Sequence, residues 1–208
     1  MRPMLRPAVA TLLLLAAAAY RPARTVVVVR LPDPLGQEGP VAEAQLVILP
    51  YDRDSVARAL AAAAPTPAPG RAALDSVVAG LRAAYARYLA LPASDRPEAR
   101  PALDAELQRA APRLDSLRKE QRAWERTAYA GWDSVTFALV RRLGRDPFAD
   151  TTDARGQAVV APPRSGAWWV TFEAWDAADP NSEWYWNLPL AGDTLYLTTA
   201  NAERRPRL

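Results

Sequence analysis

Four carboxylates lie among tryptophans in the last quarter of the sequence, and they are the residues best suited to do chemistry: Glu173, Asp176, Asp179 and Glu183. A pair of carboxylates is the catalytic equipment of most glycoside hydrolases. The loop 176–183 also offers oxygen ligands of the kind that calcium accepts, although it lacks the spacing of an EF-hand. Acidic residues in a turn-rich loop are usually solvated. The sequence of a loop also does not determine the distance between two carboxyl groups, which a catalytic pair requires. The pattern therefore favours neither a catalytic pair nor a calcium site.

Aromatic residues surround the same loop: Trp168, Trp169, Phe172, Trp175, Trp184, Tyr185, Trp186 and Tyr196. Alternation along a strand places Trp168 and Phe172 on one face and Trp169 on the other. Such clusters usually form a core, but an exposed tryptophan can stack on a sugar ring or contact another protein. We predict a ligand or partner surface made of Trp169, Trp175 and Tyr185. Packing of these residues against the core or the helices is the alternative.

The sequence contains neither histidine nor cysteine. The chain therefore lacks the commonest general base and metal ligand, and it can form no disulfide, zinc–thiolate site or thiol nucleophile. It also has no nucleophile elbow and no glycine-rich phosphate loop. We predict a protein that is not an enzyme, holds no metal and uses no cofactor.

Residues 1–19 have the organisation of a secretory signal peptide. Arg2 and Arg6 precede an apolar run, 8–19, that ends in small residues. The run is shorter than the roughly 20 residues that a membrane-spanning helix needs. We predict cleavage near Ala19 and a periplasmic or secreted protein with no stable membrane span. A buried N-terminal helix is the alternative.

The predicted mature chain is almost neutral. Removing Arg2 and Arg6 from the 26 basic residues leaves 24, against 23 acidic residues. The only basic cluster is the C-terminal tail 201–208, which we interpret as a solvated terminus. Nucleic acid is therefore not an expected partner.

Two strands are expected at the start of the mature chain. Residues 25–31 are a β-branched run that ends at Pro32, and 42–49 is a second apolar segment that ends at Pro50. Turn residues separate the two segments. We predict that they pair as a β-hairpin.

The region 52–146 has helical periodicity. Apolar residues recur every three or four positions in the segments 56–63, 74–89, 103–128 and 132–143. We predict an N-cap at Asp52 or Asp54, a kink or break at Pro112, and a left-handed end at Gly144. The expected structure is an α-helical hairpin or small bundle. A surface for self-association is the alternative to a hairpin that folds back on itself.

Strand patterns return after residue 150, in the segments 157–161, 167–175, 184–190 and 194–199. Two early strands alone would be only marginally stable. Strands, then helices, then strands therefore indicate a single β-domain with a helical insertion.

The stretch 151–158, with Asp153 and Gly156 in its turn, is followed by Pro162-Pro163, Gly166 and Trp168-Trp169-Val170. This pattern resembles the carboxypeptidase regulatory-like domains, which have a transthyretin-type sandwich. The strand 25–31 and the segment 40–44 fit the same family, although about 95 helical residues replace its short connection. The resemblance implies a folding or binding accessory, and it supplies no catalytic residues.

We therefore predict an α+β fold, in which an antiparallel Ig-like or transthyretin-like sandwich carries a helical insertion. Its parts are a signal peptide (1–19), first strands (20–51), helical insertion (52–146), remaining strands (147–200) and basic tail (201–208). The expected function is an exported, non-enzymatic binding or scaffolding module of the cell envelope, whose partner is an envelope protein or a cell-wall polysaccharide. A carbohydrate-binding module that uses an exposed tryptophan face and a carboxylate-dependent glycosidase are the alternatives.

Overall fold

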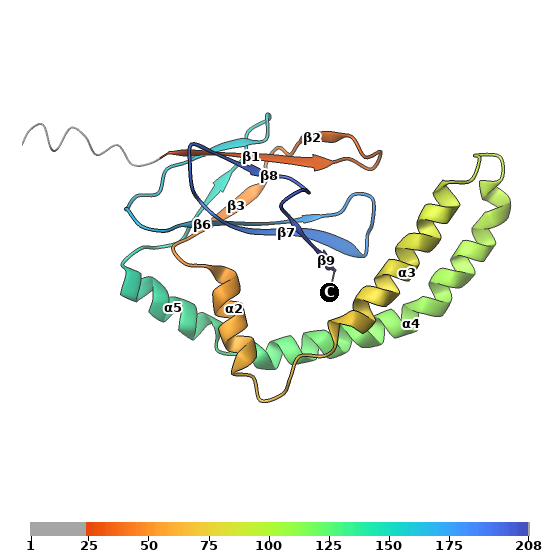
Figure 1. The fold of residues 1–208 in the computed structure, drawn as a ribbon, viewed down its shortest axis with the longest axis horizontal. Helices are drawn as coiled ribbons and strands as arrows, with labels where there is room; N and C mark the ends of the chain where they lie inside the picture. Colours follow the sequence, from red (N-terminus) through yellow and green to blue (C-terminus); the bar gives the residue numbers. More distant parts are fainter. Residues whose placement is uncertain (1–23, 208) are drawn as a thin grey trace, which may run out of the picture.

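The computed structural model describes residues 24–207 and arranges them in three layers. The strands form a four-stranded and a five-stranded sheet. Figure 1 shows one sheet beneath the other, with the helices on the outer side of the sheet that contains β6 (Trp169–Trp175) and β7 (Ser182–Pro189). The predicted signal peptide, 1–19, lies outside the described residues. Within 24–207, no helix combines the length and the apolar character that crossing a membrane requires.

The two sheets confirm the coarse prediction of a β-sandwich. The first sheet contains β1 (Thr25–Pro32), β2 (Glu38–Pro40), β5 (Gln157–Val160) and β8 (Thr194–Leu197). The second has the order β4 (Phe148–Thr151), β3 (Gln45–Leu49), β6 (Trp169–Trp175), β7 (Ser182–Pro189) and β9 (Glu203–Pro206). Neighbouring strands are antiparallel except β1 and β8, which run parallel.

The core lies between the facing sides of the two sheets and contains residues from both ends of the chain. Trp168, Val170 and Phe172 point into it, and Trp168 and Phe172 share a face as the alternation predicted. The ring of Phe172 stacks on that of Trp186, with 5.3 Å between centroids, and Trp186 is 1% exposed. This aromatic pair anchors β6 and β7 against the first sheet.

The predicted hairpin between 25–31 and 42–49 is wrong. β1 pairs with β2, whereas β3 lies in the other sheet between β4 and β6. A turn redirects the chain between β2 and β3, where Glu43 has a φ of 56°. The Thr152 hydroxyl holds this turn, because it donates to Val41 O at 2.7 Å and accepts from Ala44 N at 2.8 Å.

The helical insertion consists of α2 (Arg53–Ala62), α3 (Arg71–Leu89), α4 (Arg96–Ala128) and α5 (Trp132–Leu143). Asp52 caps α2 by accepting from Asp54 N at 3.0 Å, and Gly144 ends α5 in the left-handed region, both as predicted. α4 continues as one helix through Pro112, so the chain does not break there.

α3 and α4 form the predicted helical hairpin and bury an apolar seam between themselves. Leu74, Val78 and Leu81 of α3 pack with Leu114 of α4. This seam uses the main apolar stripe of both helices, which confirms that the hairpin folds back on itself. Figure 1 shows that its far end, at the loop 90–95, lies away from the sheets.

The C-terminal tail is not a solvated terminus, contrary to our interpretation. Glu203–Pro206 forms β9, whose register pairs Glu203 with Tyr185 and Arg205 with Glu183. Alternation therefore directs Glu203 and Arg205 to the outer side of the sheet and Arg204 to the other side. The basic residues of the tail belong to the folded domain.

The turn 153–156 between β4 and β5 is built around Asp153 and Gly156. The Asp153 carboxylate accepts from Arg155 N at 2.8 Å and from Gln157 N at 2.9 Å. Gly156 follows with a φ of 71°, and a Cβ there would lie 2.6 Å from Val29 O. The turn therefore requires glycine both for its backbone conformation and for its contact with β1.

Replacing Gly156 with alanine is expected to lower the free energy of unfolding by about 2–5 kcal/mol, the sum of left-handed strain and overpacking. Gly192→Ala is the matched control, because Gly192 has a φ of 74° and open space around its Cβ position. It should cost only about 1–2 kcal/mol. Urea unfolding of the two variants measures the difference, and equal losses would contradict the contact with Val29.

Candidate functional site

The outer face of the five-stranded sheet is polar where β6, β7 and β9 run side by side. Strand register forms two rows across it: Trp175, Glu183 and Arg205 in one, and Glu173, Tyr185 and Glu203 in the other. The opposite face of these strands carries the core residues. This alternation leaves a charged surface that the helices must cover.

The start of α2 is attached to this surface by two consecutive sets of hydrogen bonds. Asp52 accepts from Nδ2 of Asn187 at 2.6 Å, and Asp54 accepts from the Tyr185 hydroxyl at 2.7 Å. Burial would raise the pKa of Asp52, but its hydrogen bonds from Ser55, Asn187 and the backbone outweigh burial and lower it. The N-cap of α2 is therefore also its contact with the sheet.

Arg53 joins α2 to both the sheet and α5. Its guanidinium donates to Oε1 of Glu173 at 2.8 Å. The same group lies 5.7 Å from the ring centroid of Tyr185 and 5.9 Å from that of Trp132, within the range of cation–π attraction. Arg53 thus occupies the space between two aromatic rings.

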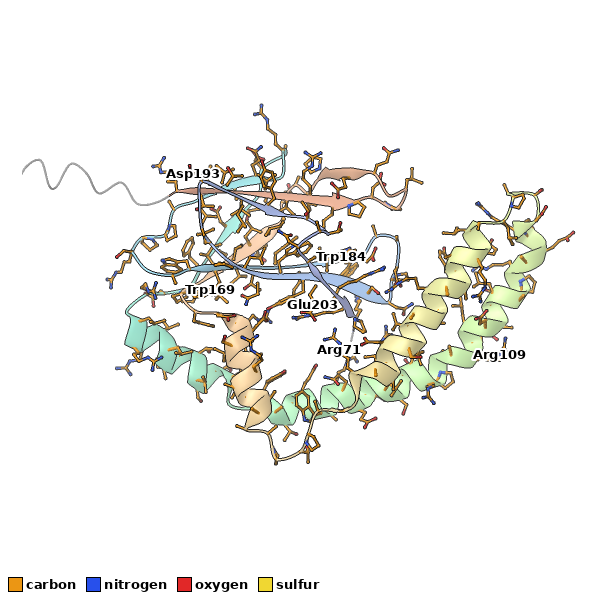
Figure 2. All side chains as sticks on the ribbon, viewed as in Figure 1. Arg71, Arg109, Trp169, Trp184, Asp193 and Glu203 are labelled. Carbon is orange, nitrogen blue, oxygen red and sulfur yellow. The ribbon has the colours of Figure 1, made fainter. Side chains whose placement is uncertain are left out.

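Arg205 covers Tyr185 from the side of β9. Its guanidinium carbon lies 3.4 Å from the ring centroid of Tyr185, and it donates to Glu203 at 2.7 Å. Arg71, at the start of α3, also donates to Glu203, at 3.3 Å, and Figure 2 shows these two side chains together. Burial, followed by the hydrogen bond to Asp54, raises the pKa of Tyr185, so its phenol is a neutral donor.

A cavity of about 650 Å³ lies between this surface and the four helices. Three arginines and three carboxylates line it: Arg53, Arg71, Arg205, Asp54, Glu125 and Glu183. Three aromatic residues also line it: Tyr129, Trp132 and Tyr185. The six charged side chains sum to zero, so the cavity is strongly polar without net charge.

Glu183 is the carboxylate in this cavity that has no hydrogen-bond or ion-pair partner among residues 24–207. Burial, followed by repulsion from Glu173, raises its pKa. Attraction to Arg205, Arg207 and Arg71 lowers this pKa but does not outweigh burial, so the charged form of the half-buried carboxylate costs folding free energy. Its oxygens are acceptors available to a ligand.

The loop 176–181 between β6 and β7 has a different role, because its carboxylates are paired with arginines. Asp179 is 7% exposed and accepts from Arg82 Nε of α3 at 3.0 Å and from the Ser182 hydroxyl at 2.7 Å. Arg204 of β9 donates to Asp176, which is 5% exposed. This charge cluster joins the helical hairpin to the sandwich.

These pairs occupy the carboxylates on which a calcium site in this loop would depend. Two of its carboxylates are neutralised by arginines, and residues 24–207 contain no group of three acidic, histidine or cysteine side chains able to hold a metal ion. The pairs also distinguish Asp176 and Asp179 from the carboxylates of the cavity.

The structure separates the three residues predicted as a ligand or partner surface. Trp175 is 70% exposed and lies beside Glu183 in the sheet, with Arg207 4.0 Å from its ring. Tyr185 is 3% exposed beneath Arg205, so it belongs to no exposed face, although it lines the cavity. Trp169 is half-buried at the other end of β6, ~20 Å away at ~3.3 Å per residue. Trp175 and Trp169 therefore cannot contact the same small ligand.

Sequence reasoning missed the residues that the helices and β9 contribute to the cavity. Glu125, Tyr129 and Trp132 lie at the junction of α4 and α5, and Arg205 belongs to the supposed tail. The tail offered no strand signal, because residues 203–206 show no alternation of apolar and polar side chains. The helix junction offered none, because its residues meet the sheet only through long-range packing.

Comparison with known proteins gives no match: no family model, no curated protein and no solved structure is similar to this chain.

Asp179→Asn is expected to destabilise the protein by about 2–3 kcal/mol at pH 7, because it weakens the charged hydrogen bonds of a buried carboxylate. Burial alone would raise the pKa of Asp179, but bonds from Ser182, Asn181 N and Arg82 hold it below 3.8. The stabilisation is therefore complete above pH 3.8 and is lost as the pH falls through the folded-state pKa.

Chemical unfolding of the wild type and Asp179→Asn between pH 7 and pH 3 measures this effect. The exposed Asp146, in the loop between α5 and β4, supplies the control variant Asp146→Asn, which should change little. A difference between wild type and Asp179→Asn that does not shrink with acid would argue against the ion pair.

Glu183→Gln should have the opposite effect and raise the melting temperature at pH 7.5. Because the folded-state pKa of Glu183 is above 4.5, its ionisation disfavours folding progressively as the pH rises from 4.5 through that value. The variant should therefore match the wild type at pH 4 and exceed it at pH 7.5. A lower melting temperature at pH 7.5, measured by differential scanning fluorimetry, would mean that Glu183 has a stabilising partner.

Proposed function

We propose that this chain is an exported, non-enzymatic binding module of the cell envelope, with a carboxypeptidase regulatory-like sandwich, and that its ligand lies in the cavity between sheet and helices. The cavity carries the proposal. Its volume of about 650 Å³ falls within the ~300–1,000 Å³ of typical ligand sites. It also contains a carboxylate, Glu183, that the described part of the chain leaves without a partner.

The pairing of the carboxylates supports a binding role over glycoside hydrolysis. A glycosidase needs one carboxyl group as acid and a second as base or nucleophile. Asp176, Asp179 and Glu173 each form an ion pair with an arginine, so a substrate or a water molecule would have to displace that arginine to reach the paired oxygens. Among the four carboxylates near the tryptophans, Glu183 is therefore the one that faces the cavity without an arginine partner in residues 24–207. It has no second unpaired carboxyl group among the other three.

The turn 153–156 and the sandwich around it support the carboxypeptidase regulatory-like type. The turn joins β4 of one sheet to β5 of the other and packs on β1, which places the motif at the corner of the sandwich. The apolar N-terminal run supports export. In this proposal the helical insertion covers the outer face of such a sandwich and thereby completes a ligand site.

Blocking the cavity should abolish binding to envelope material. In Ala57→Trp, an indole would extend from α2 into the cavity, whereas Ala59→Trp places the same group on the exposed side of that helix. Wild type and Ala59→Trp should retain a specific component of detergent-solubilised envelope or of cell-wall polysaccharide from the same organism. Ala57→Trp should retain none.

Equal retention by Ala57→Trp and the wild type would overturn the assignment of the site, as would no retention by any of the three proteins. Release of reducing sugar from the polysaccharide by the wild type, lost in Glu183→Gln, would overturn the non-enzymatic assignment.

A further inference from the structure

The cavity is complementary to a ligand without net charge. Three arginines and three carboxylates line it, and each arginine is paired with a carboxylate outside the lining: Arg53 with Glu173, and Arg71 and Arg205 with Glu203. An anionic ligand would have to compete with these carboxylates. The lining therefore offers no surplus of positive charge.

A cationic ligand is disfavoured by the use of the aromatic faces. Cations bind aromatic cavities by lying over the rings. Here Arg53 lies beside Trp132 and Tyr185, and Arg205 stacks on the ring of Tyr185 at 3.4 Å. The positions over these faces are taken by the chain's own guanidinium groups.

The polar groups that remain suit hydroxyls. Among residues 24–207, the Glu183 carboxylate, the Tyr129 hydroxyl and the Trp132 indole N–H have no hydrogen-bond partner, and all three line the cavity. The carboxylate accepts hydrogen bonds, the hydroxyl both donates and accepts them, and the indole N–H donates them. A sugar hydroxyl both donates and accepts, so a saccharide can satisfy all three groups without bringing a charge.

Trp175 provides a stacking platform next to these groups. It is the cross-strand neighbour of Glu183, and residues directly opposite on antiparallel strands have Cα atoms about 4.5–5.5 Å apart. The Arg207 guanidinium lies over one face of the Trp175 indole, 4.0 Å from the ring centroid, but the side chain of Trp175 is 70% exposed, so the other face can receive a sugar ring. An exposed indole beside hydrogen-bonding groups allows the C–H face of a sugar ring to stack while its hydroxyls bond to the cavity.

We propose that the cavity and Trp175 together bind an uncharged oligosaccharide, with one sugar ring stacked on Trp175 and the adjoining rings bonded to Glu183, Tyr129 and Trp132. This inference rests on the proposed function, whose ligand class it specifies. It also assigns different roles to the two tryptophans of β6 that alternation places on the same face. Trp175 contacts the ligand, and Trp169 does not.

Isothermal titration calorimetry on the purified protein tests the proposal with neutral probes: cellotetraose, xylotetraose, mannotetraose and N-acetylchitotetraose. Tetragalacturonate and chitosan tetramer are the anionic and cationic counterparts. At least one neutral probe should bind, and the charged probes should bind more weakly. Trp175→Ala should weaken that binding about tenfold or more, and Ala57→Trp should abolish it.

Trp169→Ala is the matched control, because it removes the same side chain from the same strand and face at the far end of β6. It should leave the dissociation constant within about twofold of the wild-type value. Trp175 is exposed, so its truncation is not expected to unfold the protein, and circular dichroism checks this.

Three results would overturn the saccharide assignment: no neutral probe binds, a charged probe binds more tightly, or Trp169→Ala weakens binding as much as Trp175→Ala. The envelope retention experiment separates this failure from that of the proposed function. If Ala57→Trp abolishes retention but no saccharide binds, the protein is a binding module with another ligand. If Ala57→Trp is retained as well as the wild type, the cavity is not the binding site and the proposed function also fails.

Discussion

The helices are held to the sandwich by charge pairs between arginines and carboxylates, and the site depends on this attachment. Arg53 reaches Glu173, Arg71 reaches Glu203, and Arg82 reaches Asp179. The apolar stripes of α3 and α4 are used against each other, so they contribute little to contact with the sheet. Polar attachment keeps side chains at a distance that apolar packing would close, and a cavity remains between the layers.

The parts of the fold that follow from local periodicity could be predicted from the sequence. The β-branched run of β1, the capping Asp52, the apolar seam of the hairpin and the left-handed Gly144 each depend on a few neighbouring residues. The partners of β1 and β3 could not be predicted correctly, because strand partners depend on where a turn sends the chain. Here the Thr152 hydroxyl, more than 100 residues away in sequence, stabilises that turn.

The candidate site was only partly predictable for the same reason. Trp175 and Glu183 could be singled out because they lie close in sequence, in two strands whose residues alternate between the faces of the sheet. The arginines that pair with the other three carboxylates come from α2, α3 and β9. Which carboxylate remains available is therefore a property of tertiary structure, and four acidic residues that look alike in the sequence acquire different roles.

The helical insertion interrupts the sandwich, and this affects how the chain must assemble. Thr25 of β1 bonds to Gly192 beside β8, 167 residues later, whereas α3 and α4 pair across a short loop. Contacts between distant residues form slowly, since a long loop must close first, while helical hairpins form quickly. The hairpin is thus expected to form early and to shorten the effective loop between the two halves of the sandwich. Until those halves meet, the edges of β1 and β3 remain open to strands of other chains, and the speed of closure sets the exposure of the protein to aggregation.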